Sequence, residues 1–335
     1  MKFSSIPRRG YVQQPTPLQK LPRFSEALGG AELWIKRDDL LPFGGNKLRK
    51  MDYLMEQAVQ AGADTLITAS TNQCCHNGIL LLLGNREGMK TQVIMEAWGD
   101  PSYRFEQSPE HALYRLAGVE RVETVTELPA GPVENMPLAQ RMAEEARAKG
   151  RTVYFMPRGG AGALGSCGYV GAALELAEQW GEAAPDAVVC PCGLGGTQAG
   201  LTVGLHMLGS KTRVIGIGVT GKSEAEMCAS VRAQCDELTA FLGLPPVPEA
   251  AVRCVDGYAG GGYAKPSAEQ YKAMQLLAQT EGVLTDPVYS GKALYGLAGL
   301  VRSGELPAGS RAVLVHTGGM NLYYDYQSFA PFEKG

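Results

Sequence analysis

The apolar positions of the chain fall into two patterns: short continuous runs, and runs spaced at three or four residues. The runs Thr65 to Thr68 and Arg311 to His316 predict buried strands, and the spacing over Ala268 to Glu281 predicts a helix. Further strands are predicted at 33–37, 92–96, 152–156, 187–190 and 214–219, and further helices at 51–59, 79–86, 110–117, 138–149, 169–180, 198–208, 223–242 and 292–302. This alternation predicts an α/β protein whose parallel sheets carry helices on both faces.

The glycine-rich segment 158–163 divides this series and is the predicted domain boundary. We expect a larger domain of residues 1–48 and 161–335 and a smaller α/β domain of residues 49–160. The proline-rich residues 14–18 predict an extended arm before the first strand. Because open parallel sheets bind ligands at the carboxyl ends of their strands, we expect the active site in the cleft between the domains.

Composition narrows the class of protein. The 335 residues are 45% hydrophobic and 19% charged, and the net charge of -3 argues against nucleic acid or an anionic membrane as partner. The N-terminus lacks the apolar core of a signal peptide, and the longest apolar run, 79–83, is far shorter than a membrane span. Eight cysteines in this context predict reduced thiols in the cytoplasm, and their spacing predicts no metal site.

Residues 44–50, Gly-Gly-Asn-Lys-Leu-Arg-Lys, are the first candidate for chemistry. The two glycines let the backbone approach a ligand closely, and Lys47 then begins a helix. A lysine at a helix start is pushed toward the neutral amine, which is the form that makes an imine with an aldehyde. The alternative is a surface loop in which Lys47 and Lys50 are solvated.

Residues 188–200 predict a strand, a glycine-rich turn and a helix start. Backbone N–H groups at such a turn converge on a phosphate at the positive end of the helix. The glycine spacing matches neither a Walker loop nor a dinucleotide-binding fold, which favours a phosphate monoester; a tight turn without a ligand is the alternative. A lysine that forms an imine, together with a phosphate site, indicates pyridoxal phosphate.

With these motifs the chain resembles the fold-type II pyridoxal-phosphate enzymes, and among them the group of D-cysteine desulfhydrase and 1-aminocyclopropane-1-carboxylate deaminase. The resemblance covers nearly the whole chain, through segments 16–18, 36–39, 44–50, 195–201, 286–293 and 316–319. It implies the two-domain, tryptophan-synthase-β-like fold with open, twisted and largely parallel sheets. It also implies that the larger domain binds pyridoxal 5'-phosphate and that the protein is a homodimer.

Carried over position by position, the resemblance implies the site residues. Lys47 would hold the cofactor and move the proton at the substrate Cα. The implied cofactor-binding residues are Lys47, Lys50, Cys75, Gly193, Leu194, Gly195, Gly196, Thr197, Ser290 and Thr317; the substrate-binding residues are Asn72, Gln73, Cys74, His76, Tyr263 and Tyr289; the catalytic residues are Lys47, Cys74, Tyr263 and Tyr289. For the two tyrosines the alternative is ordinary core packing.

The partner of the ring nitrogen separates the two chemistries of this group. The deaminase pattern has a glutamate directly after the second tyrosine, whereas this chain has Ser290 there and Thr317 in the final loop. A hydroxyl cannot keep the ring protonated as a carboxylate does, so the ring becomes a weaker electron sink. This favours α,β-elimination, in which the β group departs promptly, over the opening of a cyclopropane.

One segment departs from the family pattern. The ungapped alignment places Cys74 and Cys75 where the family has a serine near the substrate and an asparagine beside the phenolic oxygen. A thiol is a poor hydrogen-bond donor, so that oxygen loses a usual partner. A gapped alternative aligns residues 71–73 with Ser-Asn-Gln but needs a compensating insertion. We expect Cys74 at the start of a helix near His76, where its pKa is lowered; a buried, inert cysteine is the alternative.

The sequence therefore predicts a cytoplasmic pyridoxal-phosphate lyase that eliminates the β substituent of a small amino acid and gives pyruvate and ammonia. The resemblance makes D-cysteine, with sulfide as the leaving group, the leading substrate. Alternatives are sulfonated alanine, as in an L-cysteate sulfo-lyase, and chlorinated alanine. The rival functions are 1-aminocyclopropane-1-carboxylate deaminase and a non-catalytic carrier or sensor of the cofactor.

Overall fold

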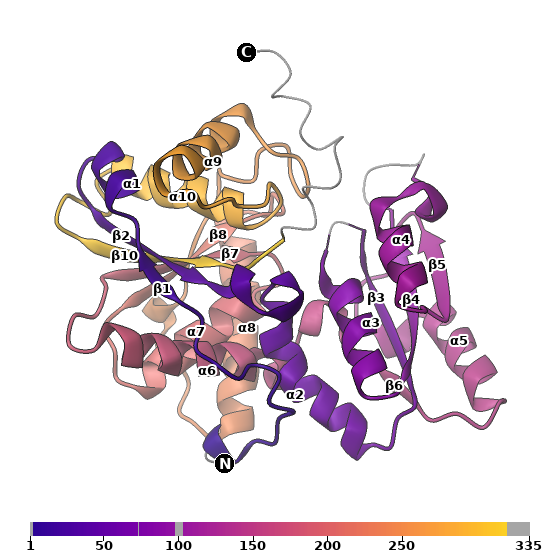
Figure 1. The fold of residues 1–335 in the computed structure, drawn as a ribbon. Helices are drawn as coiled ribbons and strands as arrows, with labels where there is room; N and C mark the ends of the chain where they lie inside the picture. The colour runs from indigo at the N-terminus through magenta and orange to yellow at the C-terminus, as the bar shows by residue number, and fades with distance from the viewer. Residues whose placement is uncertain (1–2, 73, 98–102, 320–335) are drawn as a thin grey trace. The chain divides into compact units, whose positions relative to one another are not determined.

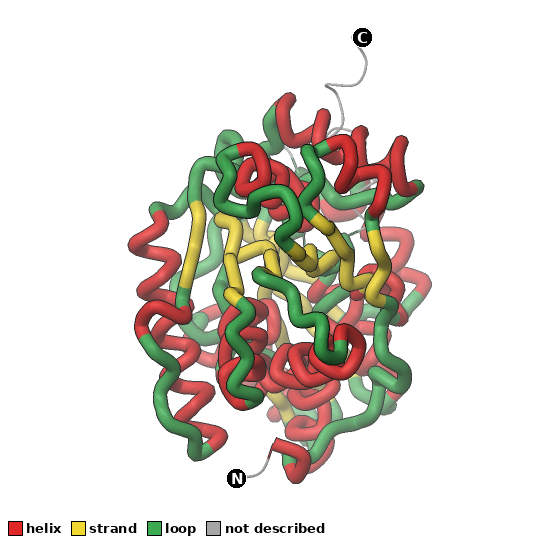
Figure 2. Tube along the Cα trace, turned by 90° about the vertical axis from the view of Figure 1, so that its left-hand side faces the viewer, coloured by secondary structure: helices red, strands yellow, loops and turns green. Residues whose placement is uncertain are grey.

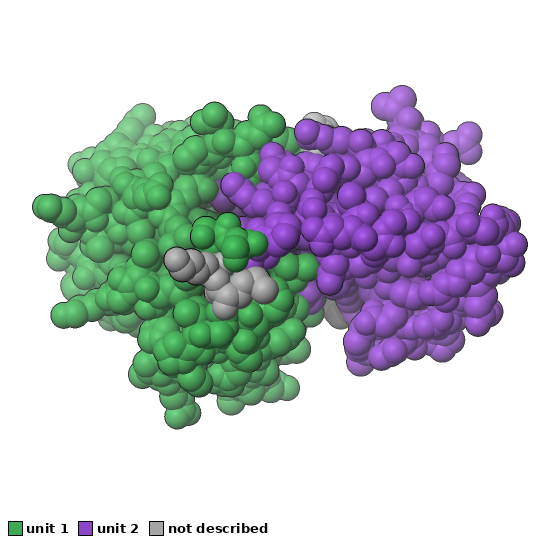
Figure 3. Space-filling view, turned by 90° about the horizontal axis from the view of Figure 1, so that it is seen from below, with its two compact units in different colours: residues 1–5, 12–46, 162–335 green, residues 6–11, 47–161 purple. Residues whose placement is uncertain are grey.

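A computed structural model describes residues 3–72, 74–97 and 103–319 (Figure 1). The backbone forms two compact units, and each is assembled from separate segments of the chain (Figure 3). Unit 1 is Met1–Ser5, Val12–Asn46 and Gly162–Gly335, and unit 2 is Ile6–Tyr11 and Lys47–Ala161. One crossing between the units therefore falls inside the lysine motif, at the peptide bond between Asn46 and Lys47.

Unit 1 contains a sheet in the strand order β1-β2-β10-β7-β8-β9. Neighbouring strands are parallel except for the antiparallel pair β1 and β2. In the centre, Leu314 of β10 lies opposite Ile35 of β2 on one side and Val189 of β7 on the other. The strands are β1 (Leu18–Lys20), β2 (Glu32–Arg37), β7 (Ala187–Cys192), β8 (Arg213–Gly218), β9 (Arg253–Val255) and β10 (Arg311–His316).

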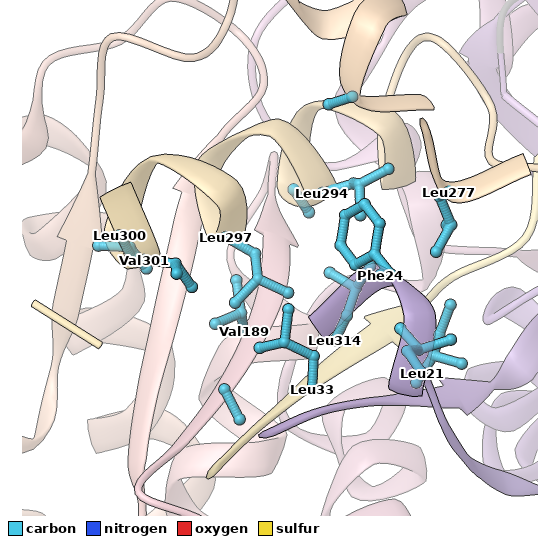
Figure 4. Packing of buried hydrophobic residues seen from close by; sticks show 14 of the residues in the cluster. Leu21, Phe24, Leu33, Val189, Leu277, Leu294, Leu297, Leu300, Val301 and Leu314 are labelled. Carbon is cyan, nitrogen blue, oxygen red and sulfur yellow. The ribbon is translucent and has the colours of Figure 1, made fainter. Parts of the chain in front are cut away.

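Helices cover both faces of this sheet, because apolar side chains alternate between the faces along each strand. On one face Leu33 and Leu314 pack with α1, α9 and α10 (Figure 4). On the other face Val313 and Val315 pack with α6 and α7. The strands lie inside and the helices outside (Figure 2). The helices are α1 (Pro22–Ala27), α6 (Ala163–Trp180), α7 (Gly196–Met207), α8 (Glu224–Leu242), α9 (Ala268–Glu281) and α10 (Ser290–Arg302).

Unit 2 contains a parallel sheet in the order β5-β4-β3-β6. Ile67 and Ala69 of β3 pack against α5, and Val93 and Met95 of β4 pack with residues of α3 and α4. The strands are β3 (Thr65–Thr71), β4 (Lys90–Glu96), β5 (Arg121–Val125) and β6 (Val153–Phe155), and the helices are α2 (Lys47–Gln60), α3 (His76–Arg86), α4 (Pro109–Leu116) and α5 (Pro137–Arg147).

The predicted α/β class with largely parallel sheets is confirmed, and β10 and α9 have the bounds predicted from sequence. The sequence prediction missed the short elements α1, β1, β5 and β9. It also ended β3 three residues early, because Ala69, Ser70 and Thr71 are buried without being strongly apolar. No helix in the described part of the chain is long and apolar enough to cross a membrane.

Candidate active site

The glycine-rich turn between β7 and α7 has the form of an anion site. Gly195 has a φ of +96°, a conformation that favours glycine, and it directly precedes α7. A Cβ atom there would lie 2.7 Å from Gln234 Nε2 and 3.1 Å from Val231 Cγ2, so the backbone turns in a space closed to a side chain. Ala199 donates its N–H to the Gly195 carbonyl at 2.9 Å, and the N–H groups before it have no acceptor within the helix. These groups can hold a phosphate.

Asn46 ties the lysine motif to two other parts of unit 1. Its side-chain amide donates a hydrogen bond to the Thr197 hydroxyl at 3.3 Å, and its backbone N–H donates to the Thr317 carbonyl at 3.0 Å. The chain immediately before Lys47 is therefore fixed by the glycine turn and by the loop that follows β10.

Lys47 begins α2, as predicted, and its side chain is partly buried. Its Nζ donates a hydrogen bond to the Gly159 carbonyl at 3.0 Å. Lys50 is buried, and a Cβ atom added at Gly160, which has a φ of +68°, would lie 3.0 Å from the Lys50 Cβ. Both lysines of the motif thus lie against the glycine-rich segment 158–160.

Ser290 and Thr317, the residues predicted to face the ring nitrogen, are in contact. Ser290 is fully buried at the start of α10, and its Oγ accepts the Thr317 N–H at 3.1 Å. The two hydroxyl oxygens lie 3.2 Å apart. The Ser290 hydroxyl also donates to the Gly318 carbonyl at 3.5 Å. The pair therefore offers a ring nitrogen neutral hydroxyl groups.

Asp286 fixes the backbone that carries Tyr289 and Ser290. Its Oδ1 accepts the N–H groups of Val288 at 2.9 Å and Tyr289 at 2.7 Å, and its Oδ2 accepts that of Ser290 at 2.8 Å. Burial raises the pKa of this carboxyl group, and the bonds from Ser290 and Tyr289 together with the charge of His316 oppose that rise. The sequence reasoning gave Asp286 no role. An aspartate shortly before a helix start is the signal that indicates such a cap.

Tyr263 and Tyr289 are hydrogen-bonded to each other through their hydroxyl groups. Their ring centres lie 5.7 Å apart and the ring planes meet at 70°. Tyr263 is followed by Ala264, a non-glycine residue with a φ of +56°. Strained backbone of this kind costs free energy and is typical of functional loops.

In unit 2, His76 presents an unpaired acceptor. Its Nε2 lies 2.9 Å from the Thr68 hydroxyl, which itself donates to the Met156 carbonyl at 3.2 Å. The hydroxyl must therefore accept from Nε2–H, which leaves Nδ1 unprotonated. Burial first, and then the charge of Lys47 and of two other cations, lower the pKa of His76 to about 3, so the ring is neutral at pH 7. Its Nδ1 has no hydrogen-bond partner in the described part of the chain.

Cys74 and Cys75 are partly exposed beside the N-terminal end of α3, which begins at His76 as predicted. The hydrogen bond from the Cys75 thiol holds the pKa of Cys74 well below its usual value, and burial opposes this. The charge of Lys47, the His76 N–H and the Ser70 hydroxyl lower that pKa further. These donors favour the thiolate form of Cys74.

The residues present fit pyridoxal phosphate by their chemistry. A primary amine, a turn of N–H groups and a pair of buried hydroxyls match the aldehyde, phosphate and ring nitrogen of that molecule. Asn72 Oδ1 and His76 Nδ1 are buried acceptors without partners among the described residues, as expected where a polar ligand binds. Unit 1 carries Gly193, Leu194, Gly195, Gly196, Thr197, Tyr263, Tyr289, Ser290 and Thr317; unit 2 carries Lys47, Lys50, Asn72, Cys74, Cys75 and His76; Gln73 lies outside the described residues.

A family model described as "Pyridoxal-phosphate dependent enzyme" matches residues 11–318. The chain belongs to this family. Because enzymes of this family use pyridoxal 5'-phosphate, this is the cofactor of the chain. The matched span includes every candidate site residue in both units.

The chain is 36% identical over 330 residues to the D-cysteine desulfhydrase of Klebsiella pneumoniae (strain 342), and the aligned region covers 97% of each chain. It is 35% identical over 329 residues to a Pyrococcus furiosus protein that carries a provisional name as a 1-aminocyclopropane-1-carboxylate deaminase, with 97% of this chain and 95% of the relative covered.

Solved structures agree with this relationship. A crystal structure of an ACC deaminase homologue has a TM-score of 0.87 and 32% identity, and covers 98% of this chain and 97% of that one. A fungal L-serine ammonia-lyase from Rhizomucor miehei, 18% identical with a TM-score of 0.66 over 95% of this chain and 98% of that one, shares the fold. The pyridoxal-phosphate dependent enzyme is thus a lyase-type enzyme of fold type II, as the sequence predicts.

Proposed function

We propose that this enzyme catalyses α,β-elimination from a small β-substituted amino acid. D-cysteine is the first candidate, and with one water molecule it gives pyruvate, ammonia and sulfide. The observation that carries the proposal is the buried hydroxyl pair of Ser290 and Thr317, which stands where a deaminase of this group has a carboxylate. Relatives named for both activities have nearly equal identity, so the site chemistry has to separate them.

Each group of candidate residues has a role in this reaction. Bound pyridoxal phosphate supplies an electron sink for the charge that develops at the substrate Cα. The Lys47 amine holds the cofactor and takes the Cα proton. Residues 193–197 bind the phosphate through their N–H groups, and Lys50 adds a second positive charge. The β substituent then departs with the electron pair of its bond to Cβ.

Ser290 limits how much negative charge the ring accepts. A hydroxyl that donates to the ring nitrogen leaves this nitrogen neutral, whereas a carboxylate keeps it protonated. A neutral ring is sufficient for elimination, because the leaving group carries the charge away. The nearby carboxylate of Asp286 is already occupied by three backbone N–H groups. This arrangement therefore disfavours the opening of a cyclopropane.

Cys74 is proposed to contact the substrate in place of the family's serine. Its sulfur is stabilised as a thiolate by Cys75, by the charge of Lys47 and by the His76 N–H. A thiolate beside a lysine can exchange a proton with it, so Cys74 can hold or protonate a group on the substrate. The adjacent acceptors Asn72 Oδ1 and His76 Nδ1 are proposed to bind donors of the substrate.

A panel of amino acids tests the proposal. The purified enzyme, loaded with pyridoxal phosphate, is given D-cysteine, L-cysteine, L-cysteate, β-chloroalanine and 1-aminocyclopropane-1-carboxylate in separate assays. We expect pyruvate and sulfide from D-cysteine, and no 2-oxobutyrate from the cyclopropane. Release of 2-oxobutyrate would establish the deaminase instead. Cofactor absorbance without any keto acid would favour the carrier or sensor.

Assembly and compartment complete the proposal. We propose a homodimer, in keeping with the resemblance to fold-type II enzymes, and a cytoplasmic location, which suits eight free cysteines. Light scattering of the purified protein tests the first, and fractionation of cells that express it tests the second. A monomer that retains full activity would contradict the proposed assembly.

A further inference from the structure

Lys292 is a buried cation that the proposed reaction does not use. It lies in the first turn of α10, two residues after Ser290, and is fully buried. Its Nζ donates hydrogen bonds to the carbonyls of Gly262 at 2.6 Å, Ala259 at 2.7 Å and Val219 at 3.2 Å. An ammonium group has three N–H donors, so all three are used. Burying such a charge costs free energy, which calls for a compensating role.

Two of these carbonyls belong to one tight turn. Gly262 donates its N–H to the Ala259 carbonyl at 3.2 Å, and the Gly262 carbonyl also accepts the Lys265 N–H at 3.2 Å. Gly262 itself has a φ of +113°, so the turn depends on glycine. Lys292 therefore holds both ends of a turn from a single atom, and the next residue after the turn is Tyr263.

The third carbonyl links the same ammonium to the end of β8. Val219 follows β8, and its N–H donates to the Cys192 carbonyl at 3.1 Å. Cys192 is the last residue of β7 and directly precedes the glycine turn that we assign to the phosphate. One buried cation thus connects the helix that carries Ser290, the turn that carries Tyr263 and the end of the strand pair β7 and β8.

We propose that Lys292 is a positioning residue, whose ammonium acts through the Ala259 and Gly262 carbonyls to hold the Tyr263 hydroxyl against that of Tyr289. The role of this tyrosine pair in binding the amino acid rests on the proposed function, whereas the fixing of the turn does not. The left-handed conformation of Ala264 agrees with the proposal, because strained backbone persists where its surroundings determine it.

Lys292→Met tests the proposal, because it keeps a long apolar stem and removes the charge and the donors. We expect a fall of about tenfold in kcat/KM, carried mainly by KM, while the visible absorbance of bound cofactor is retained. We also expect faster hydrogen exchange at the Gly262 and Lys265 amides. The control is Lys272→Met, an exposed lysine of α9, which should change neither quantity.

A double-mutant cycle with Tyr263→Phe decides whether Lys292 acts through this tyrosine. If it does, the two substitutions are non-additive, and the double variant is no worse than the more damaging single one. Additive losses, or unchanged exchange at the turn, would overturn the proposal. The exchange result stands even if no substrate is found, so it is separate from the proposed function.

A second variant keeps the test valid if Lys292→Met does not fold. Lys292→Gln keeps two N–H donors without the charge, and we expect partial protection of the Gly262 amide together with an intermediate KM. If both variants fail to fold, the positioning role is overturned, because the lysine is then needed for unit 1 as a whole.

Discussion

The candidate residues of the two units differ in how completely their polar groups are paired. In unit 1, Ser290 bonds to Thr317, and Tyr263 bonds to Tyr289. The backbone under two of these residues is fixed in turn by Asp286. These groups are held in place by the protein itself.

Unit 2 presents the opposite case. Asn72 Oδ1 and His76 Nδ1 are buried acceptors, and neither has a partner within the described residues. Next to them in the sequence, the pKa of Cys74 is lowered by the hydrogen bond from Cys75 and by the charge of Lys47. Buried acceptors left unpaired are costly unless a ligand or water supplies the donor.

The difference separates groups that contact the cofactor from groups that contact the substrate. A cofactor is the same in every turnover, so groups that contact it can be fixed in advance. A substrate arrives and departs, and the groups that bind it are left open between turnovers. We therefore expect substitutions at Ser290 and Thr317 to change cofactor binding, and substitutions at the unpaired acceptors and Cys74 to change substrate preference. The tyrosine pair, although paired, is proposed to contact the substrate.

Replacing Lys47 should have the largest effect, since the lysine is needed both for cofactor attachment and for proton transfer. In Lys47→Ala we expect turnover to fall by about 10³-fold or more, together with loss of the visible cofactor band. Product assays and absorbance spectra measure both. Lys90→Ala, at an exposed lysine that begins β4, is the control and should be unchanged. A borohydride-reducible adduct that persists in Lys47→Ala would assign the cofactor to another lysine.

Gly195→Ala should weaken cofactor binding selectively. The new Cβ would lie 2.7 Å from Gln234 Nε2, and the alanine would have to adopt a positive φ. We therefore expect cofactor affinity to fall by about 2 kcal/mol, or roughly thirtyfold. Titration with pyridoxal phosphate measures it. Gly131→Ala is the matched control, because its φ of +100° gives similar backbone strain with no atom within 4 Å. It should lower stability and leave the affinity unchanged. Equal losses of cofactor affinity in both variants would show that the phosphate does not bind at this turn.

Cys74→Ala should impair substrate turnover without releasing the cofactor. We expect at least a tenfold loss of turnover, about 1.4 kcal/mol of barrier, whereas Cys74→Ser keeps the cofactor and broadens activity toward D-cysteine. The control is Cys235→Ala, because burial raises the pKa of that thiol to about 12. Alkylation should be faster at Cys74 than at Cys235, and substrate should slow it. If Cys74→Ala is fully active and substrate does not slow alkylation of Cys74, the residue has only a packing role.

The smallest expected effect concerns His76 and stability in acid. Its pKa is about 3 in the folded chain and 6.5 in the unfolded chain, so the unfolded state binds the extra proton between these values. Its contribution is therefore present above pH 6.5 and is lost as the pH falls toward 3. From pH 6.5 to about 5.5 we expect the free energy of unfolding to fall by about 1 kcal/mol more in the wild type than in His76→Gln, measured by denaturant titration. Parallel curves would show that folding does not lower the pKa of the ring.

The sequence predicted those elements whose own apolar pattern is strong. β10 and α9 were predicted with their observed bounds because one is a continuous apolar run and the other has a helical period. β5 was missed because Arg121 and Glu123 interrupt its apolar residues, and only pairing with β4 makes it a strand. α1 is six residues long, which is too short for a helical period to be recognised.

The site shows the same division. The motif around Lys47 was recognised from local spacing, and its place at the start of α2 is confirmed. The contact between Ser290 and Thr317 joins residues 27 positions apart and depends on β10 and α10 packing in one unit. The role of Lys292 was out of reach, because its partners are backbone carbonyls, which leave no trace in residue identity.

The single carboxylate of Asp286 couples two neighbouring positions of the site. Because it holds the N–H groups of both Tyr289 and Ser290, the backbone at these positions is fixed as one unit. A mutation that placed a glutamate at position 290 would bring a second carboxyl group close to the buried Asp286, where like charges repel. An exchange of Ser290 for glutamate would therefore act on Asp286 as well as on the ring nitrogen.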